Sequence, residues 1–207
     1  AAQRPSGELF VHEPVPDPAL LADAGARVVN TREPQLLCEG SFYLSGEIPR
    51  RTSYEVGLPG HVRRSADGKS WEPDPLLMDE RFVAVRVKGR GLVVLTACSH
   101  AGVINVLRHA TELFPDVPLY GVLGGFHLSG VTEKAIPETV RDLKKLGPKL
   151  LAPGHCTGWR ALAAMSQAFD EEELAPSAVG KRYFIDRRAA PRRAPGASAR
   201  PPRGSRR

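Results

Sequence analysis

Apolar and polar positions fall into blocks along the second half of the chain, in an order typical of strands followed by helices. The runs RFVAVRV (81–87) and LVVLTA (92–97) are joined by KGRG, which predicts a β-hairpin. The second run is apolar nearly throughout, as expected for a strand buried on both faces. Further strands are predicted at 119–123, 149–152 and 179–185, and helices at 103–114, at 136–146 and from about 157. These elements predict an α/β fold with a mixed β-sheet.

The pattern is weaker before residue 81. EPVPDP (13–18) is broken by prolines, and the residues after it predict a short helix or turn, then a strand at 27–30 and another near 42–44. Residues 57–75 are polar and rich in Gly and Pro, which predicts one long loop. Loops of this length within a domain are often lids or binding loops.

The charge of the chain is concentrated at one end. The formal net charge is +6, but the 21 residues from 187 to 207 carry eight arginines and no acid, which leaves about −2 on residues 1–186. We therefore expect a partial domain over 1–186 and a disordered Arg/Pro-rich tail over 187–207. The tail is either a solvated, neutral extension or a non-specific contact for nucleic acid or an anionic membrane.

Composition excludes several classes of protein. No run of about 18 apolar residues occurs, so no membrane span is predicted, and the first residues do not resemble a signal peptide. Cys38, Cys98 and Cys156 are too few for a disulfide scaffold, so a cytoplasmic location is expected.

Three of the six histidines share one context. LVVLTACSH ends in His100, LYGVLGGFH in His127 and KLLAPGH in His155, each just past an apolar strand and at intervals of 27 and 28 residues. Ligands of α/β proteins gather at the carboxyl ends of such strands. Neutral imidazole is a common ligand of zinc and also suits iron and manganese. The pattern favours a metal site, with isolated surface or turn histidines as the alternative.

The motifs TACSHAGVIN, GGFHLSG, APGHCTGWRA and SAVGKRYF resemble the metallo-β-lactamase superfamily. The resemblance is to the branch related to dihydropterin-ribofuranosylaminobenzene phosphate synthase, and it covers residues 8–186. It implies the C-terminal part of an αββα sandwich with one or two divalent metals (zinc, iron or manganese) at one edge. By position, His100 matches a ligand of the first metal and His155 a ligand of the second. His127 stands where most of the superfamily has a bridging Asp.

The superfamily's HxHxDH signature does not occur in the chain. Two hypotheses follow. The chain is a fragment of a metal-dependent hydrolase or transferase whose small-molecule substrate, by analogy with the family, is a pterin or a phosphorylated compound. Alternatively, it is a catalytically inactive remnant or binding module. In either case an uncovered apolar sheet face would favour self-association.

The segment EIPRRTSYE supplies candidate substrate-binding residues. Arg50 and Thr52 are predicted to hold an anionic substrate, because Arg pairs with phosphate through two hydrogen bonds. An exposed, solvated loop is the alternative.

The remaining candidates are expected to be structural or exposed. Cys98 would share the face of His100 if the strand stayed extended, and Cys98 and Cys156 are interpreted as packed thiols rather than ligands. Cys38 is interpreted as structural. Turn or capping roles are expected for Asp74 and Asp79, and surface positions for His61 and His109.

Overall fold

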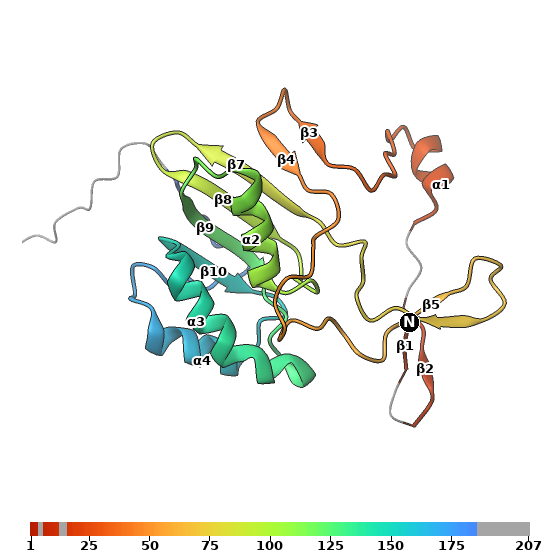
Figure 1. The fold of residues 1–207 in the computed structure, drawn as a ribbon. Helices are drawn as coiled ribbons and strands as arrows, with labels where there is room; N and C mark the ends of the chain where they lie inside the picture. Colours follow the sequence, from red (N-terminus) through yellow and green to blue (C-terminus); the bar gives the residue numbers. More distant parts are fainter. Residues whose placement is uncertain (4–5, 13–15, 186–207) are drawn as a thin grey trace, which may run out of the picture.

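A six-stranded mixed sheet organises the computed structural model, which describes residues 1–3, 6–12 and 16–185. The strand order is β10-β9-β8-β7-β4-β3 (Figure 1). Its strands are β3 (Gln35–Leu37), β4 (Phe42–Leu44), β7 (Phe82–Val87), β8 (Gly91–Thr96), β9 (Leu119–Gly125) and β10 (Leu150–Gly154). The pairs β8/β9 and β9/β10 are parallel, and the remaining pairs are antiparallel. The predicted α/β class and mixed sheet are confirmed.

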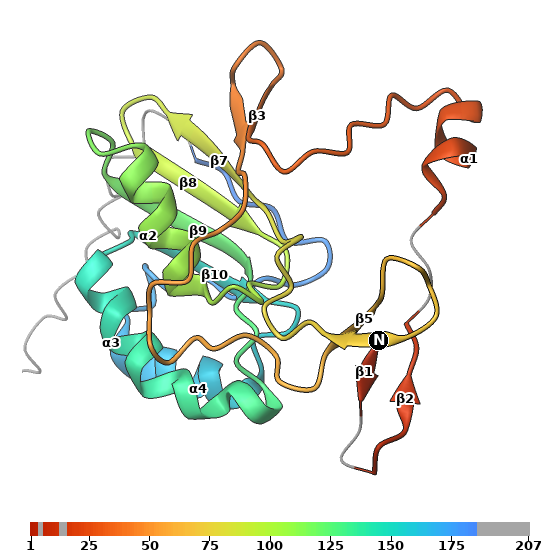
Figure 2. The same cartoon turned by 45° about the vertical axis from the view of Figure 1, so that its right-hand side comes forward.

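Three helices cover one face of this sheet. They are α2 (Val103–Leu113), α3 (Ile136–Leu146) and α4 (Trp159–Ala168), and a 3₁₀ helix, η1 (Gly130–Ala135), leads into α3. The helices group on the same side of the sheet in both views (Figures 1 and 2). All three helices lie where the sequence periodicity predicted them, with Pro137 in the first turn of α3.

The hydrophobic core lies between the helices and the sheet. Ile104 and Leu107 of α2, Leu143 of α3 and Met165 of α4 are fully buried in one cluster with strand residues such as Val94. The opposite sheet face is less well covered, since Leu95 keeps 39% of its surface exposed. The core therefore ties the three parallel strands to the helices that follow them.

The first part of the chain stands away from the helix layer (Figure 2). It contains β1 (Ala2–Gln3), β2 (Leu9–Phe10), the short helix α1 (Pro18–Asp23), and a hairpin of β5 (Val62–Arg64) and β6 (Trp71–Pro73). Residues 57–75, predicted to be one long loop, thus include a short hairpin. Within the described ranges no helix has both the length and the apolar content needed to cross a membrane.

Two predicted strands are wrong. Residues 27–30 form no strand, and Val28 and Val29 remain exposed because no neighbouring strand accepts their backbone groups. Residues 179–185 also form no strand. The backbone instead follows β10 earlier: Leu151 donates to Glu173 and accepts from Ala175, and the carbonyl of Pro153 accepts from Ser177. The predicted tail over 187–207 lies outside the described residues.

Candidate metal centre

Three histidines lie at the edge where the parallel strands β8, β9 and β10 end. Because these strands are neighbours and run in the same direction, their carboxyl ends meet at one edge of the sheet. His100, His127 and His155 each follow one of these strand ends. We call this the histidine edge, and its position agrees with the sequence prediction.

His100 and His127 are in direct contact. Their ring centroids are 4.7 Å apart and the rings meet edge to face at 79°. Burial lowers the pKa of both rings, and repulsion from His100 lowers the pKa of His127 further. Lowered pKa values favour neutral imidazoles at neutral pH, the form that binds metals.

His127 carries a specific sign of a missing partner. Its Nδ1 atom is buried, and among the described residues no hydrogen-bond partner reaches it. A buried polar atom without a partner costs free energy, so such atoms usually mark a bound water, an ion or a functional role. An imidazole nitrogen with an unused lone pair suits a metal ion, so the donor chemistry of this edge fits the group that the resemblance implies.

The backbone turns sharply where these histidines emerge. His127 has a φ of 43°, His155 of 50° and Ser99, next to His100, of 59°, all in the left-handed region. Side-chain hydrogen bonds hold these turns: the Ser99 hydroxyl donates to the carbonyl of Gly125 at 2.7 Å, and the Thr132 hydroxyl donates to the carbonyl of His127 at 2.6 Å. The turns redirect the chain at the strand ends, which sets where the imidazoles lie.

A carboxylate from the preceding segment fixes the backbone of His100. The N–H groups of His100 and Ala101 donate to the two carboxylate oxygens of Glu80, at 2.8 and 2.7 Å. Glu80 was not identified from the sequence, because nothing in its local context indicates a contact 20 residues downstream. It is a positioning residue for His100.

A second carboxylate caps the N-terminus of α2. Gly102 precedes this helix and has no side chain to cap it. The buried carboxylate of Glu55 instead accepts the N–H groups of Ile104 and Asn105, each at 2.8 Å. Burial raises the pKa of Glu55, and these hydrogen bonds oppose the rise. The loop that carries Glu55 is thereby attached beneath the histidine edge.

The predicted substrate-binding residues lie on this same loop. The Thr52 hydroxyl donates to Glu55 at 2.9 Å, so Thr52 supports the capping carboxylate. Arg50 is half-buried and donates to the carbonyl of Leu76, but its Nε and Nη1 atoms are buried and lack a partner among the described residues. Repulsion from Arg50 also contributes to the lowered pKa of His100, after burial, which is the largest cause. Arg50 therefore offers unused donors in the electrostatic neighbourhood of the histidine edge.

A pocket of about 50 Å³ opens beside His100 and His127. Its other lining residues include Tyr54, Phe126 and Lys134. A water needs roughly 10–15 Å³ of such space, so the pocket admits a few waters or a small chemical group. Its lining combines two imidazoles, a lysine and aromatic side chains, a composition that suits an anionic or flat chemical group.

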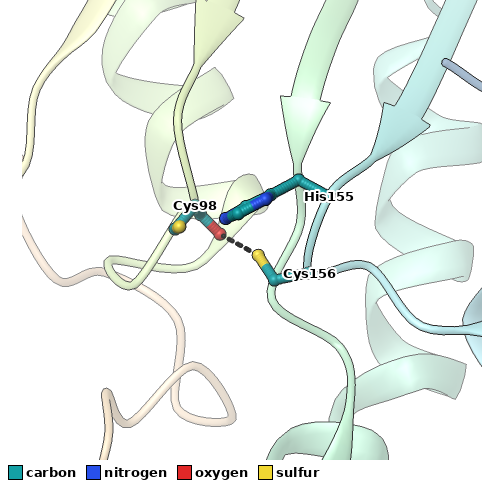
Figure 3. A group of neighbouring side chains, drawn as sticks. All are labelled: Cys98, His155 and Cys156. Carbon is teal, nitrogen blue, oxygen red and sulfur yellow. Dashed lines mark hydrogen bonds between the residues drawn. The ribbon is translucent and has the colours of Figure 1, made fainter. Parts of the chain in front are cut away.

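His155 lies beside two thiols rather than in ring contact with the other histidines. One donor atom from each of Cys98, His155 and Cys156 can be chosen so that all three lie within 4.8 Å of one another (Figure 3). The Cys156 thiol donates to the carbonyl of Cys98 at 3.4 Å. Burial, and then the neighbouring Cys98, raise the pKa of Cys156 to about 12. The predicted sharing of a face between Cys98 and His100 is not observed, because β8 ends at Thr96 and the chain then turns.

The other candidates are more varied than the sequence indicated. Cys38 is exposed, so it does not have the structural role that was predicted. His109 is half-buried with its ring against Phe82 at a centroid distance of 5.9 Å, and His61 is half-buried and stacks on His12. Asp79 is exposed and raises the pKa of His100, opposing the effect of burial. The backbone N–H of Asp74 donates to the carbonyl of His61, which extends the β5–β6 pairing by one residue, so the turn or capping role of Asp74 stays a prediction.

Comparison with known proteins gives three informative matches, although no protein-family model matches the chain. The chain is 31% identical over 150 residues to 7,8-dihydropterin-6-methyl-4-(β-D-ribofuranosyl)-aminobenzene-5′-phosphate synthase of Methanocaldococcus jannaschii, covering 72% of this chain and 50% of that protein. It is 36% identical over 124 residues to an uncharacterized protein of the same organism, covering 60% of this chain and 43% of that protein.

A solved structure agrees with these sequence matches. A metal-dependent hydrolase of the β-lactamase superfamily superimposes with a TM-score of 0.64 at 27% identity, covering 77% of this chain and 58% of that one. The chain spans about half the length of the curated relatives it matches.

Proposed function

The chain belongs to the metallo-β-lactamase-fold superfamily, in the branch related to dihydropterin-ribofuranosylaminobenzene phosphate synthase, and on this premise we propose that it carries part of the active site of a metal-dependent hydrolase or transferase. The observation that carries the proposal is the His100–His127 contact, together with the buried, unpartnered Nδ1 of His127. We propose His100, His127 and His155 as the ligands of a divalent metal such as zinc, iron or manganese.

The chemistry follows from what the chain's own residues do. When bound, such a metal supplies Lewis-acid polarisation of a phosphoryl or carbonyl oxygen. Glu80 holds the backbone of His100 at a fixed position, and burial lowers the pKa of His100 and His127, which favours their neutral imidazoles. The pocket beside them has room for a small reacting group of the substrate next to the histidine edge.

The substrate class is proposed from the relative and from the site together. The named relative is a synthase of a dihydropterin compound bearing a ribofuranosyl 5′-phosphate. The unpartnered Nε and Nη1 of Arg50 support the binding of a phosphate, and the Phe126 and Tyr54 side of the pocket supports a flat ring. We therefore propose a pterin or another phosphorylated small molecule.

A second candidate function is a catalytically inactive remnant or binding module. The observation that favours it is that the described residues offer histidine donors for a metal, while no residue among them is assigned as a proton donor to a substrate. Self-association through the less covered sheet face, and nucleic-acid binding by the Arg-rich segment, stay predictions in either case.

Metal binding tests the proposed site, and turnover by the metal-loaded protein then separates the two functions. The full chain is dialysed against Zn²⁺, Fe²⁺ or Mn²⁺ and its metal content is measured by elemental analysis. We expect close to one bound metal per chain at the histidine edge, and a large loss in His100→Ala and His127→Ala. His109→Gln is the matched control, because His109 packs on Phe82 and its ionic neighbours are Glu112 and Arg51.

Turnover of a generic chromogenic phosphodiester by the metal-loaded protein would support the proposal that the chain carries part of an enzyme's active site. Metal binding without any turnover would favour the binding module. Metal content well below one per chain that does not change in His100→Ala would refute the proposed metal site.

A further inference from the structure

Two cysteines and one histidine come together across the end of β9, where the chain leaves β8 on one side and β10 on the other. We propose that Cys98, Cys156 and His155 form a thiolate-rich site for a soft or borderline divalent metal, separate from the His100–His127 pair. The proposal goes beyond the proposed function: it assigns His155 to the two cysteines instead, which leaves His100 and His127 as the ligands of the metal proposed above.

The geometry of the three donors supports the site. One nitrogen of His155 and the two sulfurs lie within 4.8 Å of one another. Around a tetrahedral metal with bonds of roughly 2.3 Å to sulfur and 2.0 Å to nitrogen, such donors sit about 3.5–3.8 Å apart. Each donor therefore needs to move by only about half an ångström to one ångström, which a change of side-chain torsion provides.

The chain also leaves room for the sulfur. A Cβ atom built on Gly125, at the end of β9 between the two cysteine-bearing segments, would lie 2.7 Å from the sulfur of Cys156. Only a glycine therefore lets Cys156 approach this strand end. The same built atom would lie 2.7 Å from the carbonyl oxygen of Ala97, so the segment next to Cys98 is held equally close.

The solvent exposure of the three donors and their chemistry both support a metal site here. His155 is exposed, whereas Cys98 and Cys156 are half-buried, so a metal ion can reach the imidazole first and the sulfurs second. Thiolate sulfur selects zinc and other soft ions over magnesium and calcium. Binding forms two metal–sulfur bonds and one metal–nitrogen bond, and each thiol releases its proton to solvent.

Cobalt(II) is the probe, because thiolate ligands give it an intense near-ultraviolet charge-transfer absorption that imidazole ligands do not. The full chain, reduced under nitrogen and freed of reductant, is titrated with Co²⁺. We expect this absorption to appear at about one ion per chain. Cys98→Ser and Cys156→Ser should each abolish it and weaken binding at this site about a hundredfold or more. Cys38→Ser is the matched control, because Cys38 is an exposed free thiol.

Mapping of alkylated cysteines provides a readout that a merely packed thiol would not change. With Co²⁺ bound, Cys98 and Cys156 should be protected from iodoacetamide while Cys38 reacts at its original rate. His100→Ala and His127→Ala should leave both the absorption and the protection unchanged.

The outcomes separate the two proposals. Bound Co²⁺ with imidazole-type spectra alone, lost in His100→Ala, would overturn the thiolate site and support the proposed function. Charge-transfer absorption without any bound metal that depends on His100 or His127 would support the thiolate site and overturn the metal site of the proposed function. A Cys98–Cys156 disulfide in protein purified anaerobically, or no Co²⁺ binding at all, would overturn the thiolate site.

Discussion

Glutamate 55 provides a stringent test of how the histidine edge is held together. Glu55 is only 8% exposed, and its carboxylate accepts hydrogen bonds from the N–H groups of Ile104 and Asn105 at the start of α2, 49 and 50 residues downstream. The change Glu55→Gln keeps the size of the side chain but replaces one acceptor oxygen with an NH₂ group. That NH₂ group faces a backbone N–H, so one hydrogen bond is lost and one buried donor is left without a partner.

The magnitude follows from these contacts. A buried donor left unsatisfied costs about 1–3 kcal/mol, and removal of a negative charge from a helix N-terminus costs about 0.3–1 kcal/mol more. We therefore expect Glu55→Gln to lower the free energy of unfolding by roughly 1–4 kcal/mol. Urea denaturation of the full chain, followed by circular dichroism, measures the change as a shift of the midpoint at constant slope.

A matched control lies on the same contact between loop and helix. Glu112 of α2 forms an ion pair with Arg51 at 2.8 Å, and both side chains are close to half exposed. Exposed pairs contribute about 1 kcal/mol or less, so Glu112→Gln should cost little. Equal losses in the two variants, or a loss below about 1 kcal/mol in Glu55→Gln, would refute the assignment of Glu55 as the cap of α2.

Three further changes test the surroundings of the site. Glu80→Ala should lower the affinity for Co²⁺ at the His100–His127 pair by roughly 10–100-fold, because the backbone of His100 loses its fixed position, and equilibrium dialysis would show no change if Glu80 has no such role. Gly125→Ala should lower the free energy of unfolding by about 1–3 kcal/mol and expose Cys156 to alkylation, and wild-type values for both would contradict the close packing at this strand end. Burial alone would raise the pKa of Asp142, but hydrogen bonds from Arg141, Tyr54 and Lys145 outweigh it and lower the pKa from 3.8 to about 2. The stabilisation by this carboxylate is therefore complete above about pH 4 and is lost as the pH falls to 2, so denaturation curves of Asp142→Asn should lack this pH dependence.

Sequence periodicity correctly predicted the elements whose apolar positions face the core of the sheet and its helices. The β7–β8 hairpin combines two apolar runs with a clear turn signal, and the helices α2, α3 and α4 show a strong apolar period, although the residue before each helix makes no side-chain capping bond. The strand predicted at 27–30 had the β-branched residues but no partner strand, and a strand without a partner has no hydrogen bonds to stabilise it. Strand propensity alone was therefore insufficient outside the core.

The candidate site was predicted at the level of strands but not of side chains. The spacing of His100 and His127 placed them correctly at neighbouring strand ends, and the structure brings their rings together. Sequence could not place Cys98 beside His155, because that contact depends on the turn after Thr96 and joins segments more than 50 residues apart. The roles of Glu80 and Glu55 were missed for the same reason, since they arise only when distant loops pack.

The left-handed backbone at His127 and His155 has a consequence for how this protein can change. Each L-residue other than glycine pays roughly 1–2 kcal/mol for that conformation, so glycine at either position would relieve strain. His127→Gly would then gain thermal tolerance while losing an imidazole from the histidine edge. A library screened for heat resistance alone should therefore enrich glycine at these two positions and discard metal binding, whereas a screen that requires the metal should retain the strained histidines.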